Sequence, residues 1–236
     1  MHSRTTTDLT IPIGRCRTTT KPFRLTNNLI GKSKRDFEMV IARYDEDISW
    51  SDNYKDFRTI YNKGNDISGC EYIQLENVGH LADTILQHIL RNYENLAQVT
   101  FFTHGSFNYR INQRIYERAD KTPCHAFFED FIQLGDNFLK SIQCYNLPAP
   151  NERFYNYPET AGEVFEYLFE KPYVANFPWA DGKWISVSKK FILSRPKAFY
   201  QKMLDWVLQP CDGNQTIYRT RGIYIERFIL YAFMYK

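Results

Sequence analysis

Apolar and polar positions along the first half of the chain alternate between strand-like and helix-like periods. Residues 37–42 form a short, mainly apolar run, which is typical of a buried strand. Residues 57–61 alternate as a second strand does, and residues 72–75 predict a third, shorter one. Apolar residues at helical spacing then predict a helix over 77–95, and a buried strand follows at 99–102. Strand, helix and strand in this order indicate a mostly parallel sheet with covering helices.

The second half of the chain has a different rhythm, with longer helical segments and more Pro, Tyr and Asn between them. No internal repeat or low-complexity linker separates the two halves, so we expect one α/β domain over residues 36–236 with an elaborated second lobe. The pattern predicts helices over 127–141, 161–169, 196–208 and 222–235, with Pro196 in a first turn, and a strand over 184–188.

Residues 1–35 precede this domain and are rich in Thr, Arg and Lys without periodicity. We interpret them as a basic, solvated N-terminal arm, with a partly ordered strand at 9–13 as an alternative. Binding of the arm to an acidic surface is a second alternative.

Composition narrows the class of protein. The 236 residues are 43% hydrophobic and 24% charged, as in an ordinary globular protein, which excludes a disordered acidic chain, a collagen or a coiled coil. The net charge of +3 does not indicate a nucleic-acid-binding protein. Aromatic residues make up 17% of the chain, enough to fill a core and to line a cleft.

Features that would direct the chain to a membrane or to secretion are not found in the sequence. There is no apolar run of the roughly 20 residues that span a bilayer, and the N-terminus lacks the apolar core of a secretory signal. The five cysteines are scattered without metal-ligand spacing, which indicates free thiols in a reducing compartment. We therefore expect a cytoplasmic protein, with the sequon at Asn214 as the one contrary sign.

Three predicted strand or loop ends carry polar residues that suit a ligand, because ligands of open parallel sheets bind outside the carboxyl ends of the strands. Residues 43–47 offer a cation, a ring and three carboxylates. Residues 77–80 open a helix, whose free N–H groups favour an anion such as phosphate. Residues 103–105 place an imidazole after a strand. Together these segments could hold a nucleotide, with Tyr44 stacked on the base.

Each of these segments also has a purely structural interpretation. The carboxylates of 45–47 could form a solvated turn with a helix cap, Asn77 and Gly79 could form a cap and a tight turn, and His104 could bond a backbone carbonyl. Other catalytic templates are missing: the sequence has no glycine-rich dinucleotide or phosphate loop, no serine-hydrolase elbow and no zinc-protease motif.

Several longer motifs occur in an order that resembles a known family. Residues 40–50, VIARYDEDISW, resemble "VVARYxEDLSW", and residues 61–64 match "YNKG". Further matches are 77–96 with "NVGRE…YLxxIIxNYDNL", 99–105 with "VTVFLQGH" and 186–200 with "FxVSRERIxxRPxxFY". These motifs resemble an uncharacterised domain family of fungal and viral proteins, itself similar to GT-A-type glycosyltransferases. The segment 219–228 also resembles the "GYxxER" helix of polysaccharide glycosyltransferases.

The resemblance implies a single Rossmann-like, mostly parallel sheet with flanking helices. It implies an enzyme that transfers a sugar from a nucleotide-sugar donor to a glycan, a glycoprotein or another hydroxyl acceptor. His104 would lie at the leaving-group end, and Glu226 would be the base. The donor would be bound by Ala42, Arg43, Tyr44, Asp45, Asp47, Asn77 and Gly79, and the acceptor side would be lined by Trp184, Ser186 and Ser188.

Two departures from the family pattern leave alternatives open. His80-Leu81 stands where the family has Arg-Glu, and Thr103-His104-Gly105 stands where such transferases carry an Asp-x-Asp metal motif. A non-catalytic carbohydrate- or protein-binding module on the same fold is one alternative. A metal-dependent hydrolase using Asp45, Asp47 and His104 is another. We expect weak or absent metal dependence, with Mn²⁺ or Mg²⁺ as the cofactor if one is required.

Overall fold

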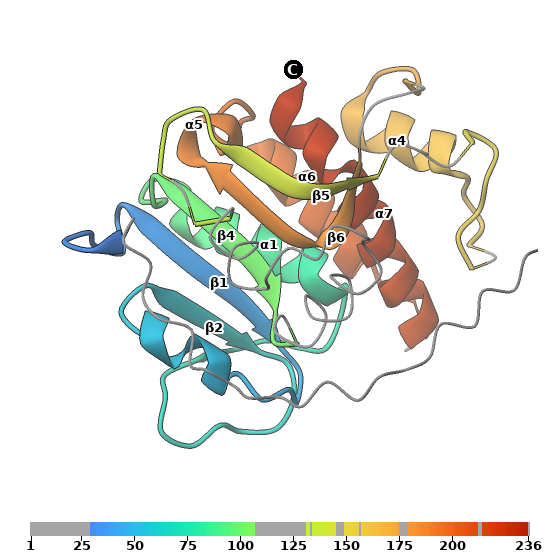
Figure 1. The fold of residues 1–236 in the computed structure, drawn as a ribbon. Coiled ribbons are helices and arrows are strands. Elements are labelled where there is room, and N and C mark those ends of the chain that lie inside the picture. Colours follow the sequence, from blue (N-terminus) through green and yellow to red (C-terminus); the bar gives the residue numbers. More distant parts are fainter. Residues whose placement is uncertain are drawn as a thin grey trace, which may run out of the picture.

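A six-stranded mixed sheet forms the centre of the protein (Figure 1). The structure is a computed structural model that describes residues 29–106, 131–132, 134–144, 149–155, 157–174, 179–211 and 214–235. Its strands are β1 (Phe37–Arg43), β2 (Arg58–Asn62), β3 (Ile73–Gln74), β4 (Val99–His104), β5 (Leu139–Cys144) and β6 (Trp179–Ser188). Its helices are η2 (Ser49–Tyr54), α1 (His80–Asn92), α4 (Ala161–Phe169), α5 (Lys189–Ile192), α6 (Lys197–Leu208) and α7 (Gln215–Met234).

The strand order is β3-β2-β1-β4-β6-β5. The first four strands are parallel: β1 pairs with β2 on one side and with β4 on the other, and β2 pairs with β3. Strand β6 is antiparallel to β4, and β5 is antiparallel to β6. The sequence-based expectation of an α/β protein with a mostly parallel sheet and flanking helices is confirmed at this level.

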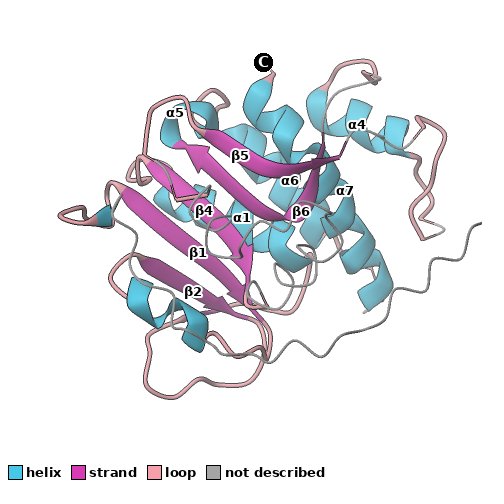
Figure 2. Ribbon diagram, viewed as in Figure 1, coloured by secondary structure: helices cyan, strands magenta, loops and turns pink. Residues whose placement is uncertain are grey.

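The sheet has a helix-covered face and a face covered by shorter segments (Figure 2). Alternate residues of β1 explain both faces, because successive side chains of a strand point to opposite sides. Val40 and Ala42 belong to the larger core, which includes residues of α1, α4, α6 and α7. Phe37, Met39 and Ile41 face the smaller core, which η2 covers with Trp50 and Tyr54.

Most predicted elements of the first half are confirmed with shifts of a few residues, and so are α4 and α6. Pro196 is the N-cap of α6 rather than part of its first turn, which suits a residue without a backbone N–H. The last helix begins seven residues before the predicted Gly222, because the Asn214 side chain caps it by accepting from Thr216 N at 3.0 Å.

The helix predicted over 127–141 is wrong where the structure describes it. Residues 139–144 form β5, and Leu139 pairs with Val187 of β6. The backbone turns at 135–137, where Gly135 has φ +149°, a conformation that breaks a helix. Phe131 and Ile132 are apolar because they fill the smaller core, and the pattern was therefore mistaken for a helical face.

The end of the predicted N-terminal arm packs against the sheet. Leu29 is 1% exposed in the smaller core. Lys34 Nζ donates to Thr59 Oγ1 at 2.6 Å and to the Arg58 carbonyl at 3.0 Å. Within the described residues, the segment from 29 to 36 thus contacts the sheet. Residues 1–28, including the proposed strand at 9–13, lie outside the described residues.

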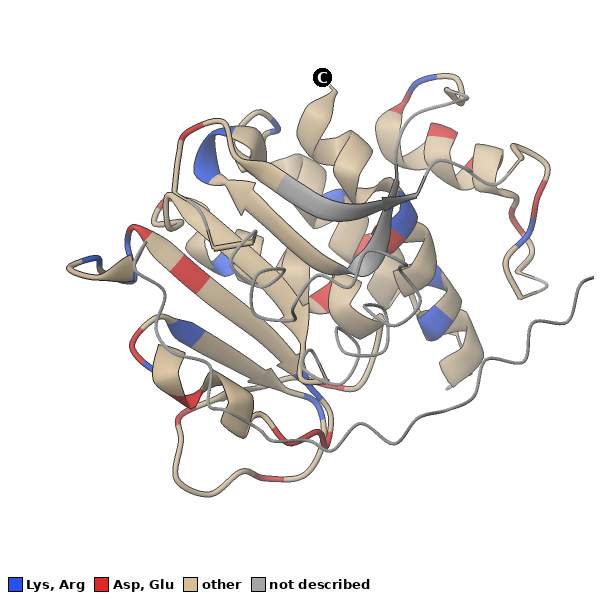
Figure 3. Cartoon of the chain, in the orientation of Figure 1, with Lys and Arg blue, Asp and Glu red and all other residues tan. Residues whose placement is uncertain are grey.

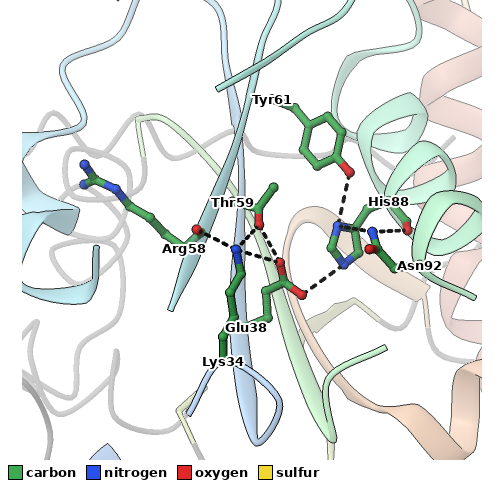
Figure 4. A network of polar contacts seen from close by, with 7 residues as sticks. All are labelled: Lys34, Glu38, Arg58, Thr59, Tyr61, His88 and Asn92. Atoms are coloured by element: carbon green, nitrogen blue, oxygen red, sulfur yellow. Dashed lines mark hydrogen bonds and ion pairs between the residues drawn. The ribbon is translucent and has the colours of Figure 1, made fainter. Parts of the chain in front are cut away.

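A buried polar network joins β1, β2 and α1 inside the larger core (Figure 4). Glu38 accepts a 2.5 Å hydrogen bond from Thr59 Oγ1, and its other oxygen lies 3.5 Å from His88 Nε2. His88 Nδ1 lies 3.2 Å from the Tyr61 hydroxyl. Both His88 and Tyr61 are fully buried, and burial lowers the pKa of His88 from 6.5 to about 4. The imidazole is therefore neutral at physiological pH.

Candidate functional site

The strand order places a topological switch point between β1 and β4. From β1 the chain moves outward through β2 and β3, and α1 then returns it to the other side of β1, where β4 lies. Open α/β sheets bind ligands in the crevice outside the carboxyl ends of the strands at such a point. Acidic and basic residues gather around the carboxyl ends of β1 and β2 (Figure 3). The segments selected from the sequence at 43–47 and 103–105 lie on this edge.

Arg43, the last residue of β1, forms hydrogen bonds with the two loops that follow β1 and β2. Its Nη1 donates to Asn62 Oδ1 at 2.7 Å, to the Asn65 carbonyl at 2.8 Å and to the Tyr44 carbonyl at 3.1 Å. Its Nε donates to the Glu46 carbonyl at 3.1 Å. These bonds fix the loops that follow β1 and β2, so any contact of Arg43 with a donor would come in addition to this structural role.

The three carboxylates that follow β1 each accept hydrogen bonds from a different residue. Asp45 Oδ1 accepts from Asn65 N at 3.0 Å, and Glu46 Oε2 accepts from Tyr44 N at 2.7 Å. Asp47 accepts from both the backbone N and the hydroxyl of Ser49, each at 2.9 Å, at the first residue of η2. Asp47 thus bonds the first residue of η2 without capping it, because the N-cap position is Ile48, which makes no side-chain cap hydrogen bond. The ring of Tyr44 is 52% exposed, as stacking on a base would require.

The carboxyl end of β4 closes against the loop that follows β1. Gly105 N donates to the Ala42 carbonyl at 2.8 Å, and Trp50 Nε1 donates to the Gly105 carbonyl at 2.8 Å. A Cβ on Gly105 would lie 2.9 Å from Glu46 Oε2, so glycine leaves room for that side chain. Glu46 is thereby held at the switch point, although it was not among the predicted site residues. Half-buried His104 pairs with Ala42 across the two strands.

Lys63, the first residue after β2, is a buried cation that the sequence analysis did not select. Its Nζ donates to Asp83 Oδ2, to the Val78 carbonyl and to the His80 carbonyl, each at 2.7 Å. The side chains of Lys63 and Asp83 are only 4% and 2% exposed. A usable signal was present in the sequence: Asp83 lies on the apolar face of α1, and a buried carboxylate requires a cation.

The charge of Lys63 is balanced from two elements. Burial lowers its pKa, and the charges of Asp83 and then Glu226 oppose that effect. Gly222 of α7 packs on the backbone of Gly79, and Glu226 lies one helical turn further along α7. Glu226 is half-buried there. The predicted base therefore lies in the same part of the molecule as the predicted donor segment at 77–80.

The start of α1 is tightly packed. Gly79 and His80 both have left-handed backbone, with φ +59° and +53°. A Cβ on Gly79 would lie 2.6 Å from Val207 Cγ1, and a Cβ on Gly222 of α7 would lie 2.4 Å from the Gly79 carbonyl oxygen. The backbones of α1 and α7 therefore touch at this point. Gly79 is buried by protein, so its predicted contact with the donor is not available on this side.

The residues predicted to line the acceptor side lie inside the protein. Trp184 is 2% exposed and belongs to the smaller core, while Ser186 and Ser188 are fully buried. Ser188 Oγ donates to the Asp136 carbonyl at 2.9 Å. Their alternation along β6 therefore marks an inward sheet face covered by residues 131–138, and an acceptor cannot reach them in this conformation.

An open pocket of about 750 Å³ lies beyond the ends of β2 and β3. Its polar lining comes from Lys63, Gln74, Glu76, Asn77 and Gln215. Its apolar lining comes from Leu75 and Val78. The volume is in the range of small-ligand sites. The structure thus brings the predicted Asn77 together with Lys63 and with Gln215, the first residue of α7. These residues lie far apart in the sequence, so their combination could not be predicted from it.

The predicted metal-ligating residues do not form a shared site. Among the residues that the structure describes, no three His, Cys, Asp or Glu side chains are grouped so that they could hold a metal ion. Asp45, Asp47 and His104, the ligands of the hydrolase alternative, are therefore not assembled around one point. Asp45 and Asp47 instead bond the loop backbone, as described above.

Comparisons with protein-family models, with curated proteins and with solved structures gave no significant match. The resemblance to GT-A-type glycosyltransferases thus remains a prediction based on the motifs. In the described segments, no helix has the length and apolar character needed to cross a bilayer.

Proposed function

We propose that the protein is a GT-A-like glycosyltransferase that binds a nucleotide-sugar donor at the carboxyl edge of its sheet. The observation that carries the proposal is the switch point between β1 and β4, with exposed Tyr44 beside it and a pocket at the ends of β2 and β3. The motif resemblance supports the same reaction class. The acceptor would be a glycan, a glycoprotein or another hydroxyl compound.

In this proposal the chain's residues divide the reaction between them. Tyr44 stacks on the base, and Arg43 keeps the loops after β1 and β2 in place while facing the donor. Glu226 takes the proton of the acceptor hydroxyl as that oxygen bonds to the anomeric carbon. The bond from that carbon to the nucleoside diphosphate breaks, and the diphosphate leaves with the electron pair near His104.

A non-catalytic carbohydrate- or protein-binding module is the second candidate. The specific observation in its favour is that Arg43, Asp45 and Asp47 are all bonded to neighbouring loops, as a structural cluster would be. The cytoplasm is the proposed compartment for either function, which the free thiols of Cys70 and Cys211 support.

We expect nucleoside diphosphates to bind, and Arg43→Ala to weaken that binding about tenfold or more, because a charge-assisted contact and the bonds that fix the two loops are lost together. Calorimetric titration with UDP, GDP and ADP, with and without Mn²⁺ or EDTA, measures this directly. Exposed Arg91→Ala, at the far end of α1, is the matched control. Unchanged affinity in Arg43→Ala removes the assignment of Arg43 to the donor site, and the absence of nucleotide binding favours the binding module.

We expect EDTA to have little effect on nucleotide binding in the same titrations. Loss of binding with EDTA, restored by Mn²⁺, contradicts that expectation.

Glu226→Gln should lower sugar transfer by about a hundredfold or more while leaving donor binding unchanged, because the amide cannot accept the acceptor's proton. The measurement is initial rate together with donor affinity. The exposed carboxylate exchange Glu163→Gln at the start of α4 serves as control. Full activity in Glu226→Gln would assign the base to another residue.

A further inference from the structure

The pocket at the ends of β2 and β3 offers hydrogen-bonding amides. Gln74, Asn77 and Gln215 each present a carboxamide with both a donor and an acceptor, and Glu76 adds a carboxylate. All four side chains are exposed. Within the described part of the chain, the side chains of Asn77 and Glu76 have no hydrogen-bond partner. Gln74 Oε1 accepts a hydrogen bond from Asn62 Nδ2 at 3.1 Å, and Gln74 Nε2 donates one to the Leu75 carbonyl at 3.3 Å.

The cation of this pocket is not available to a ligand. Lys63 has three ammonium protons, and three acceptors lie 2.7 Å from its Nζ: Asp83 Oδ2 and the carbonyls of Val78 and His80. Asp83 neutralises its charge, and Glu226 adds a second carboxylate nearby. The remaining charged group of the lining is Glu76, so the pocket disfavours an anion.

The helix start beside the pocket is also a poor phosphate site. The carbonyls of Val78 and His80 point at Lys63, and Gly222 of α7 packs directly on the backbone of Gly79. A phosphate would have to displace this contact to reach the helix N-terminus. The sequence assigned Asn77 to the donor and the helix start at 77–80 to an anion, whereas the surroundings of Asn77 favour a sugar.

We propose that this pocket binds a neutral, polyhydroxylated sugar ring, with the amides of Asn77 and Gln74 and the carboxylate of Glu76 bonding adjacent hydroxyl groups. Hydroxyls both donate and accept, which matches amides better than any anion does. Leu75 and Val78 give the ring an apolar surface. Lys63 is the positioning residue, because it fixes the backbone on either side of Gly79.

Sugar binding by this pocket does not depend on the proposed function. Whether the bound sugar belongs to the donor or to the acceptor does rest on the proposed function. The probes are methyl glycosides of glucose, galactose, mannose and N-acetylglucosamine, and UDP and GDP alone and as their sugar conjugates. Binding to the full chain is followed by saturation-transfer NMR and calorimetry. Asn77→Ala removes a pocket amide, and Asn95→Ala removes an exposed amide at the opposite end of the sheet as control.

We expect at least one methyl glycoside to bind, and Asn77→Ala to weaken it about five- to tenfold while Asn95→Ala has no effect. If a sugar conjugate binds more tightly than its nucleotide and loses that gain in Asn77→Ala, the sugar is the donor's; an unchanged gain assigns it to the acceptor. The inference is overturned if no glycoside binds, if Asn77→Ala leaves glycoside binding intact, or if it abolishes UDP or GDP binding instead. Glycoside binding without nucleotide binding keeps the inference and removes the proposed transferase.

Discussion

Replacing Lys63 by methionine should destabilise the protein by about 3–5 kcal/mol, since removing one partner of a buried ion pair leaves the other charge uncompensated. In this variant Asp83 keeps its carboxylate at 2% side-chain exposure with no cation beside it. The carbonyls of Val78 and His80 lose their donor at the same time. Methionine has nearly the same length and volume, so packing changes little. Urea unfolding followed by tryptophan fluorescence measures the loss.

Lys202→Met provides the matched control for this prediction. Lys202 also makes a 2.7 Å ion pair, with Glu170, but that carboxylate is 80% exposed. A surface pair of this kind contributes about 0–1 kcal/mol. The double variant Lys63→Met/Asp83→Leu should recover much of the loss, because neither charge then remains buried. A loss in Lys63→Met no larger than in Lys202→Met would show that the buried pair does not stabilise this edge of the sheet.

The sequence predicted the parallel half of the sheet well, for a physical reason. The runs 37–42 and 99–102 are buried on both faces, so they are apolar except for Glu38 and Thr100 and contrast sharply with the polar ends that follow. The helical face of α1 is equally clear, because one side lies against the sheet. The local sequence pattern was sufficient to predict an element where the same surroundings extend along its whole length.

Prediction failed where contacts come from distant parts of the chain. Phe131 and Ile132 were assigned to a helix, although they pack on the sheet face and lead into β5. Ser186 was assigned to the acceptor side from the family resemblance, and the sequence did not show that it is buried on the sheet face where Phe131 and Ile132 pack. Lys63 was missed because its partners lie 15 to 20 residues away.

The candidate site shows the same division. The sequence located its segments, since polar residues after apolar strands mark the carboxyl edge. It did not show which of these side chains already form hydrogen bonds with the loops. Arg43 and Asp47 do so, each with loop backbone. Nor did it show the close approach of Gly222 to Gly79, which decides what the start of α1 can bind.

His88 should make the stability of the protein depend on pH by about 3 kcal/mol between pH 7 and pH 4. Burial lowers its pKa from 6.5 to about 4; Lys34 adds to this effect, and Glu38 opposes it. In the folded protein the ring stays neutral, whereas in the unfolded chain it takes up a proton as the pH falls below 6.5. Stability is therefore fully present above that pH and is lost as the pH falls towards 4.

The groups facing the imidazole explain why the network of Figure 4 does not rescue the charged form. Glu38 of β1 lies 3.5 Å away but is shared with Thr59 and Lys34, and β2 offers the Tyr61 hydroxyl. Phe102 of β4 presents an apolar ring at 5.7 Å between centroids. One shared carboxylate at this buried position does not replace the hydration that an imidazolium loses.

The test compares wild type with His88→Gln, which cannot titrate, by urea unfolding at steps from pH 7 to pH 4. Wild type should be the more stable at pH 7, and its advantage should shrink by about 3 kcal/mol as the pH falls, because the folded protein holds His88 neutral. Acidic groups common to both proteins cancel in this difference. A constant difference between wild type and His88→Gln, or an NMR titration of His88 centred near 6.5, would show that its ring is hydrated in the folded protein.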